Sequence, residues 1–412
     1  MNKALKYKIV AWLVALFLAF LLPQGIYKQS QIQQIAIVSG IGIDKVGEQL
    51  EVSVSVLVPE PSSSYAPKQT ISSAKGENIA KAINAIEIKI GQELGLAHCY
   101  IIILGDEFTQ TDVTKDLDYL MRSNIMGNNS AILHTDKKAK EILEVNSSLS
   151  ENNINNLQNI AKFNQEHYNS SNTTLIGLFN DYLSETHCSV MGSISLEEIS
   201  NSQNSSQNEG NNTSSPSESG SSQNKQDNSQ SKKTLSNKGD AIILKNGRKI
   251  AKLTNEEIGY FAWLDTKSQS GYLSIENYSN QNLQNANITL KLKNEKSTFD
   301  ASIINNSLVL KTSISFECFV DNIINENDNI RSIHNNMLTD DFKQKVQEKI
   351  YDEIQQALTI SKENNFDIIG VFNIFNNKLN KSWKNYLMSL ENPDDYMQNL
   401  LITIDVKMTS KY

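Results

Sequence analysis

The stretch QQIAIVSGIGIDK, residues 33–45, decides between two kinds of fold. A dinucleotide-binding unit needs the pattern G-x-G-x-x-G at the point where a strand leads into a helix. Here Gly40 and Gly42 are followed by a turn that starts at Asp44, and the third glycine is missing. Residues 50–58 then alternate between apolar and polar types, as in a strand with one buried face. The stretch therefore predicts strand, turn, strand, with the two glycines permitting close backbone approach or a β-bulge.

The N-terminal residues indicate on which side of the cell membrane the protein lies. Lys3, Lys6 and Lys8 precede an unbroken apolar run over residues 9–22. Positive charge followed by an apolar segment is typical of an export signal. The run is shorter than the roughly 20 residues of a comfortable membrane span, and no small-x-small cleavage site follows it. We expect residues 1–28 to be an uncleaved signal anchor, with the lysines inside and the bulk of the chain outside; a cleaved signal peptide is the alternative.

Length, net charge and cysteine content limit the classes of protein to which this chain can belong. The 412 residues allow two or three domains. The net charge of −8 argues against a nucleic-acid binder, which usually carries a basic face. The cysteines Cys99, Cys188 and Cys318 lie far apart and form no C-x-x-C pattern. They are expected to be buried as small apolar residues; a single bridge such as Cys99–Cys188 is the alternative.

Residues 29–199 are expected to form an N-terminal α/β region, with a core at 33–145 and a helical extension after it. Strands are predicted at 100–104 and 130–134, and helices at 76–94, 112–122 (capped by Thr111), 138–143 and 174–183. Strands that alternate with helices predict an α/β or α+β region, and the hairpin start favours a mixed sheet. Residues 200–238 are rich in Asn, Ser and Gln and almost free of apolar residues, which predicts a disordered linker.

Residues 239–412 are expected to form a C-terminal α+β domain. It starts with a β-hairpin around Asn246-Gly247, a strong turn signal. The elements predicted to follow are a helix at 255–265 and strands at 271–275, 288–293, 297–304 and 308–319. After them we expect a long helix at 340–362 capped by Thr339, short elements at 367–375 and 379–388, and a closing strand at 400–408.

Five motifs in this order resemble the Ger(x)C family, the C subunits of spore germinant receptors. They are IAIVSGIGIDK at 35–45, SAKGENIAKAINAIEIKIGQELGLAHCYIIILGDEF at 73–108, DLDYLMRSN at 116–124, AIILKNGRKIAKLTNEEIGYFAWL at 241–264 and NNFDIIGVFNIFNNKLNKSWKNY at 364–386. The last motif is similar to the family's D-x-x-G … W block and places it on Asp367, Gly370 and Trp383. The resemblance covers almost the whole chain.

One position departs from the family. Family members typically carry a lipobox that ends in Gly-Cys-Trp upstream of the first strand. Counting back from Ala36 places Gly25, Ile26 and Tyr27 there. Because Ile26 stands where the lipidated cysteine would be, lipidation through a thioether is excluded at this position. This favours anchoring by the apolar segment; the alternatives are that the protein is released or that its partners hold it at the membrane.

The apolar segment predicts one N-terminal membrane-anchor helix. The resemblance implies that a multi-domain α+β ectodomain with mixed, largely antiparallel sheets flanked by helices follows it. It implies a non-catalytic, membrane-tethered subunit needed for receptor assembly and signal coupling in spore germination. The implied partners are the A and B membrane subunits of the receptor, on the outer face of the inner spore membrane. No nucleic acid is implied.

The sequence offers no constellation typical of a catalytic site. His98, His134, His167, His187 and His334 form no H-E-x-x-H pair, and His98 and Cys99 would point to opposite faces of a strand. Asp340-Asp341 suits a helix N-terminus, and Asp394-Asp395 suits a turn after Pro393. We therefore expect no catalytic, cofactor-binding or metal site and no enzymatic activity. The alternatives are an exported solute-binding module and a secreted hydrolase.

Overall fold

The computed structural model describes most of the chain from the first predicted strand onward. The described residues are 12–13, 35–58, 68–122, 126–127, 129–145, 153–166, 173–199, 232–265, 270–280, 283–324 and 339–410. Among them, no helix is both long and apolar enough to cross a membrane. Apart from residues 12–13, the predicted anchor at 1–28 lies outside the described residues, as do Ile26, His167, His334 and residues 200–231 of the predicted linker.

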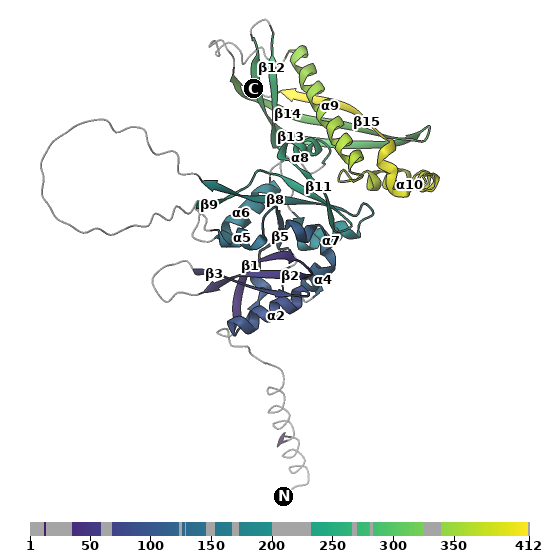
Figure 1. Cartoon of the computed structure of the whole chain (residues 1–412). Coiled ribbons are helices and arrows are strands. Elements are labelled where there is room, and N and C mark those ends of the chain that lie inside the picture. The colour runs from purple at the N-terminus through teal and green to yellow at the C-terminus, as the bar shows by residue number, and fades with distance from the viewer. Residues whose placement is uncertain are drawn as a thin grey trace, which may run out of the picture.

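The larger of the two described sheets is mixed and contains eleven strands (Figure 1). Its strands are β1 (Ile35–Val46), β2 (Gln49–Val58), β3 (Lys68–Gly76), β4 (Glu93–Gly95), β5 (Ile101–Gly105), β6 (Ala131–Thr135), β7 (Thr173–Thr174), β8 (Cys188–Ile199), β9 (Lys232–Ser236), β10 (Ala241–Lys245) and β11 (Arg248–Leu253). The main order is β11-β10-β8-β6-β5-β1-β2-β3. β1 pairs antiparallel with β2 and parallel with β5, so the predicted hairpin lies within a mixed sheet.

Helices cover both faces of this sheet. They are α2 (Ile79–Ile90), α3 (Asp106–Thr109), α4 (Val113–Arg122), α5 (Ala139–Glu144), α6 (Asn153–Glu166) and α7 (Leu175–Leu183), with a short 3₁₀ helix at Leu96–His98. Ile102 and Leu104 of β5 belong to the core that includes α2, α4 and α7. Ile101 and Ile103 belong to the core that includes α5 and α6. β5 is an unbroken apolar run because both of its faces are buried.

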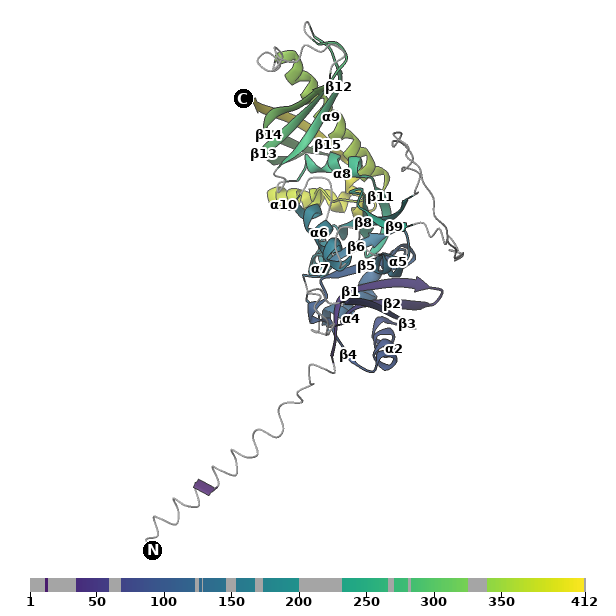
Figure 2. The same cartoon turned by 90° about the vertical axis from the view of Figure 1, so that its left-hand side faces the viewer.

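The second sheet has the order β12-β13-β14-β15. Its strands are β12 (Ser270–Tyr278), β13 (Ala286–Ile304), β14 (Ser307–Ile324) and β15 (Leu400–Ser410), and its helices are α8 (Asn255–Ala262), α9 (Asp340–Glu363) and α10 (Val371–Ser389), with a 3₁₀ helix at Pro393–Asn399. α9 packs along this sheet (Figure 2), and every fourth residue from Phe342 to Leu358 is buried in the shared core. Thr339 caps α9 by accepting a hydrogen bond from the Phe342 N–H at 3.3 Å. The predicted α+β architecture with mixed sheets is confirmed.

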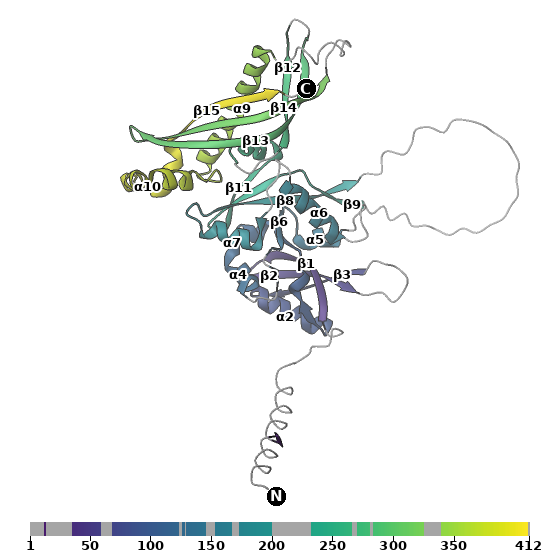
Figure 3. The same cartoon turned by 180° about the vertical axis from the view of Figure 1, so that it is seen from behind.

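The hairpin β10–β11 lies in the larger sheet. The hairpin was expected in the C-terminal domain, but β10 pairs antiparallel with β8 and extends the larger sheet (Figure 3). The linker prediction is wrong for Lys232–Ser236, because β9 pairs with β8 over those residues. One feature explains both the position of the hairpin and the strand at Lys232–Ser236: β9 and β10 form hydrogen bonds with β8, which lies more distant in the sequence than a local pattern covers.

Residues 68–76 form β3, a strand that the sequence did not predict. As an edge strand it needs few apolar side chains, because it has one neighbour. Two further predictions are wrong in detail. Thr111 does not cap α4; its hydroxyl donates to the Phe108 carbonyl, and Asp112 Oδ1 accepts from the Thr114 N–H at 3.2 Å. The two strands expected at 288–293 and 297–304 are one strand with a register shift between them.

Two remaining details concern α10 and the cysteines. The two elements expected at 367–375 and 379–388 are one helix, α10, which is kinked at Leu379. Cys99, Cys188 and Cys318 are buried and free, as the first of the two interpretations predicted.

Candidate functional site around His134

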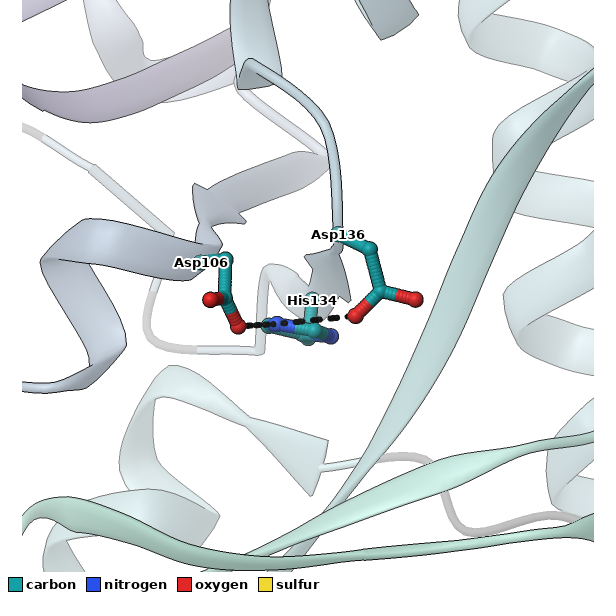
Figure 4. A group of neighbouring side chains, drawn as sticks. All are labelled: Asp106, His134 and Asp136. Carbon is teal, nitrogen blue, oxygen red and sulfur yellow. Dashed lines mark hydrogen bonds and ion pairs between the residues drawn. The ribbon is translucent and has the colours of Figure 1, made fainter.

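Two neighbouring strands of the larger sheet end in acidic residues. β5 and β6 are parallel, and Gly105 pairs with Thr135 at their carboxyl ends. Asp106 directly follows β5 and Asp136 directly follows β6, so both carboxylates lie at the same edge of the sheet. The side chain of His134 lies between them (Figure 4).

The imidazole of His134 is fully buried and bonded at both nitrogens. Its Nδ1 lies 2.9 Å from Ser193 Oγ, and its Nε2 lies 3.1 Å from Asp106 Oδ1 and 3.9 Å from Asp136 Oδ1. An ionised carboxylate can only accept hydrogen bonds. Nε2 therefore carries the proton and donates to Asp106, while Nδ1 accepts from the Ser193 hydroxyl.

Two lysines from β11 neutralise the carboxylates. Lys249 Nζ donates to Asp106 Oδ1, and Lys252 Nζ donates to Asp136 Oδ2. Residues three apart on a regular strand point to opposite faces. The pairing of β10 with β11 shifts by one residue at Ile250, and this bulge brings both lysines to the same face.

The electrostatics of the cluster favour a neutral imidazole. Burial, together with the Lys249 charge, lowers the pKa of His134 to about 4, although the hydrogen bond to Asp106 opposes this shift. Burial acts to raise the pKa of Asp106, but the hydrogen bonds from Lys249 and His134 outweigh it and lower that pKa. At neutral pH the cluster thus pairs two carboxylates with two ammonium groups around an uncharged histidine.

The turn of the β10–β11 hairpin contacts α4. The Gly247 carbonyl accepts from the Val113 N–H at 3.0 Å. Gly247 has φ +74°, and a Cβ at this position would lie 2.2 Å from Asp112 Oδ1. Glycine is therefore required here for both the backbone conformation and the close contact.

The histidine and the two carboxylates of the cluster resemble the ligands of a metal site, but the lysines that pair with the carboxylates argue against metal binding. The ligand atoms of Asp106, His134 and Asp136 lie within 4.8 Å of one another. However, Lys249 and Lys252 already place two ammonium groups at the carboxylates, and His134 Nε2 carries a proton. The cluster therefore suits an ionic cross-link between the hairpin and the sheet better than a cation site.

A serine, a histidine and an aspartate linked by hydrogen bonds, as Ser193, His134 and Asp106 are here, also form the catalytic triads of hydrolases. Here Ser193 is 6% exposed and His134 is 0% exposed. A substrate cannot reach the Ser193 hydroxyl in this conformation, and a histidine with a pKa of about 4 is a poor general base at neutral pH. The geometry gives no support to hydrolysis at this cluster.

Gly40 and Gly42 lie where α5 and α6 pack on β1. A Cβ at Gly40 would lie 2.5 Å from Ile154 Cδ1, and a Cβ at Gly42 would lie 3.1 Å from Ala139 Cβ. The register of β1 against β2 also shifts between Val38 and Gly40. Both glycines thus allow helices to approach the strand closely.

Asp44 caps α5. Its Oδ1 accepts from the Ala139 N–H at 2.8 Å, and its Oδ2 accepts from the Lys140 N–H at 3.2 Å. Burial raises the pKa of Asp44 in spite of these two bonds. A Cβ at Gly105 would lie only 2.1 Å from Asp44 Oδ1, so this cap depends on a glycine directly before Asp106.

Asp367 and Gly370 form the start of α10. Asp367 accepts hydrogen bonds from the N–H groups of Gly370, Val371 and Phe372 at 2.8–2.9 Å and from the Tyr396 hydroxyl at 2.8 Å. Gly370 has φ +80°, a conformation that glycine adopts without strain. Burial raises the pKa of Asp367 although these bonds favour its charged form.

Trp383 packs within an aromatic cluster beside Asp367. It is fully buried, with ring centroids 5.4–5.7 Å from those of Phe372, Phe375, Tyr386 and Tyr396. The predicted motif residues therefore fall into two groups, one on the larger sheet and one at α10.

Sequence reasoning missed the His134 cluster. His134 was set aside because no second histidine lies at a metal-binding spacing, and Asp106 and Asp136 were not considered. The available signal was that two short apolar strands, IIILG and AILHT, are each followed at once by aspartate. Their side-by-side register, which brings the carboxylates together, is not visible in the sequence.

Comparison with known families covers both parts of the chain. The family model described as "Spore germination protein N-terminal domain" matches residues 28–196. The one described as "Spore germination B3/ GerAC like, C-terminal" matches residues 238–411. The chain belongs to the Ger(x)C family of spore germination proteins.

This Ger(x)C chain is also similar to a solved structure. A crystal structure of the GerBC protein is similar to it at 12% sequence identity, over 93% of this chain and 100% of that chain, with a TM-score of 0.49. No curated protein matches the chain.

The His134 cluster joins the two matched regions of this Ger(x)C protein. Asp106, His134 and Asp136 lie in the first region, and Lys249 and Lys252 lie in the second. The cluster therefore fixes the start of the second region onto the sheet of the first.

Proposed function

We propose that this chain is the C subunit of a nutrient germinant receptor and that it acts through assembly and signal coupling without catalysing a reaction. The observation that carries the proposal is the match of both Ger(x)C family models, in order, over residues 28–196 and 238–411. The burial of His134 and the neutralised carboxylates beside it support a structural role for the candidate site. The partners would be the A and B membrane subunits of the receptor.

The proposal includes tethering to the outer face of the inner spore membrane by residues 1–28. Three lysines before an apolar run at 9–22 support an uncleaved anchor. Ile26 at the lipobox position supports anchoring by this segment instead of by a lipid.

Deletion of the gene tests the receptor role. In a strain without other nutrient receptors, deletion should abolish nutrient-triggered germination, and the wild-type gene should restore it. Normal germination of the deletion strain would refute the proposal.

Fractionation of spores tests the tether. The full chain should be found in the inner-membrane fraction. A variant whose residues 1–28 are replaced by a cleavable signal peptide should move to the soluble fraction in a strain that lacks the A and B subunits. If that variant stays in the membrane fraction, the anchor role of residues 1–28 is wrong.

A further inference from the structure

The strand β15, drawn in yellow, forms one edge of the second sheet (Figure 3). It pairs parallel with β14 without a register shift: Leu400 pairs with Leu308 at one end, and Ser410 pairs with Cys318 at the other. Within the described part of the chain, no strand pairs with its other side. Edge strands are commonly protected by a proline, a bulge or short length, and β15 has none of these over its 11 residues. Its outer side therefore offers a regular row of N–H and C=O groups to a further strand.

The sequence of β15 is complementary to itself about Val406. In an antiparallel pair of two β15 strands centred on this residue, Asp405 of each copy lies opposite Lys407 of the other. Thr403 of each copy likewise lies opposite Thr409. These four side chains are exposed, and they share one face of the strand because they lie two residues apart. Opposite charges and threonine pairs directly across two strands stabilise a sheet, whereas like charges destabilise it.

The position of the centre matters for the charges. If the pair of strands were centred on Asp405 or on Lys407, two like charges would lie opposite each other. If it were centred on Ile404, each of the two charges would lie opposite an uncharged residue. Within one chain, Asp405 and Lys407 form an ion pair at 4.0 Å, but the two side chains are 51% and 75% exposed, so solvent screens it. Both charges are thus available to a second strand.

The inner face of β15 supplies apolar surface for the same contact. A groove of about 560 Å³ lies between this strand and α9, where Ile404 and Val406 meet Gln347 and Tyr351. Ile404 and Met408 pack against the core and keep part of their surface in solvent. In the pairing centred on Val406, Ile404 of one copy lies opposite Met408 of the other. Both side chains then lose exposed apolar surface, which is favourable.

The contact of α9 with the β15 backbone is compatible with strand pairing. Gln347 Nε2 donates to the Val406 carbonyl at 3.1 Å. A backbone carbonyl has two lone pairs and can accept a second hydrogen bond. One acceptor position of Val406 therefore stays available to a partner strand.

We propose that two copies of this chain associate through antiparallel pairing of their β15 strands about a twofold axis at Val406. The two four-stranded sheets then form one continuous sheet. The occupant of the edge is a second copy because the complementarity is that of β15 with itself, and most homo-oligomers use such twofold, self-complementary interfaces. The inference goes beyond the receptor role and does not depend on it.

Sedimentation equilibrium of the purified full chain in density-matched detergent micelles tests the proposal. The wild type should show a reversible equilibrium between monomer and dimer. Asp405→Lys and Lys407→Asp each place like charges opposite each other at both symmetric positions, so each should raise the dissociation constant at least about tenfold. The double variant Asp405→Lys/Lys407→Asp restores opposite charges and should return the dissociation constant to within about threefold of the wild type.

Glu276→Lys is the matched control, because Glu276 is an exposed carboxylate on β12, at the other edge of the same sheet. It should leave the dissociation constant unchanged within about twofold. A monomeric wild type, failure of the double variant to restore the dimer, or equal weakening by Glu276→Lys would overturn the proposal. If the wild type is monomeric and spores with Asp405→Lys nevertheless fail to germinate, the edge binds another protein and the proposal is wrong. These outcomes are independent of the gene-deletion assay.

Discussion

Lys249 donates a hydrogen bond to Asp106, which lies 143 residues earlier in the chain. The two residues belong to regions that different family models match. Together with the contact between Gly247 and Val113, the pair holds the β10–β11 hairpin on the sheet that contains β5. The hairpin, which belongs to the second region, is thus joined to the first region by an ion pair and by a backbone hydrogen bond.

Replacement of Lys249 by methionine should destabilise the protein. Its side chain is 15% exposed, so methionine keeps the aliphatic packing while Asp106 loses its ammonium partner. We expect the free energy of unfolding to fall by about 1–3 kcal/mol, measured by urea denaturation.

Lys252→Met is the matched control for this substitution. Lys252 and Asp136 are 38% and 40% exposed, so solvent screens their pair more strongly. The expected loss is below about 1 kcal/mol. Equal losses for the two variants would show that burial of the Lys249 pair does not matter.

Acid should destabilise the protein through His134. The pKa of this residue is about 4 in the folded chain and 6.5 in its ordinary state. Between these values the unfolded chain binds a proton that the folded chain does not bind, so stability falls as pH falls from 6.5 to 4. The shift corresponds to about 2–4 kcal/mol. Urea denaturation at a series of pH values measures this loss.

His134→Gln isolates that contribution, because glutamine does not titrate. Burial raises the pKa of Asp44 and of Asp367, and each of these groups adds stability as pH falls. Their effect is common to the wild type and the variant, so the difference between the two pH profiles reports on His134. The variant should lose stability less steeply between pH 6.5 and 4. Parallel profiles would contradict the assignment.

Sequence patterns predicted the elements whose packing is local. β2 was recognisable because its apolar residues alternate with polar ones, but its opposite face, which carries Ser53 and Ser55, is buried as well. α9 was recognisable because Phe342, Val346 and Ile350 repeat at helical spacing. β3 was missed because KQTISSAKG, at an edge, needs little apolar surface.

The candidate site could not be predicted because it depends on long-range pairing. Asp106 and Asp136 come together only through the register of β5 with β6. Lys249 reaches them only because β10 pairs with β8, which places the hairpin on the larger sheet. Neither relationship leaves a periodic pattern in the sequence, whereas Asp367 and Gly370 act within a few residues of each other and were recognisable as a motif.

Gly105→Ala should destabilise the larger sheet. The added Cβ would lie 2.1 Å from Asp44 Oδ1, and Asp44 would have to leave the N–H groups of Ala139 and Lys140 that it caps. We expect a loss of about 2–4 kcal/mol in the free energy of unfolding, measured by urea denaturation.

Gly127→Ala is the control for Gly105→Ala. Among the described residues, the nearest atom to a Cβ at Gly127 is Ser130 Oγ at 3.9 Å, and this glycine does not have positive φ. Its stability should stay within about 0.5 kcal/mol of the wild type. A similar loss in both variants would mean that the contact with Asp44 is not the cause.

Asp367→Asn should weaken the start of α10. The carboxylate accepts four hydrogen bonds, three from backbone N–H groups and one from Tyr396. An asparagine amide has one oxygen, so its NH₂ group would face a donor, and we expect a loss of about 2–3 kcal/mol in urea denaturation. Asp394→Asn, at an exposed carboxylate, should change stability by less than about 0.5 kcal/mol. If Asp367→Asn were as stable as the wild type, the four hydrogen bonds to the Asp367 carboxylate would not stabilise the start of α10, and the prediction would be wrong.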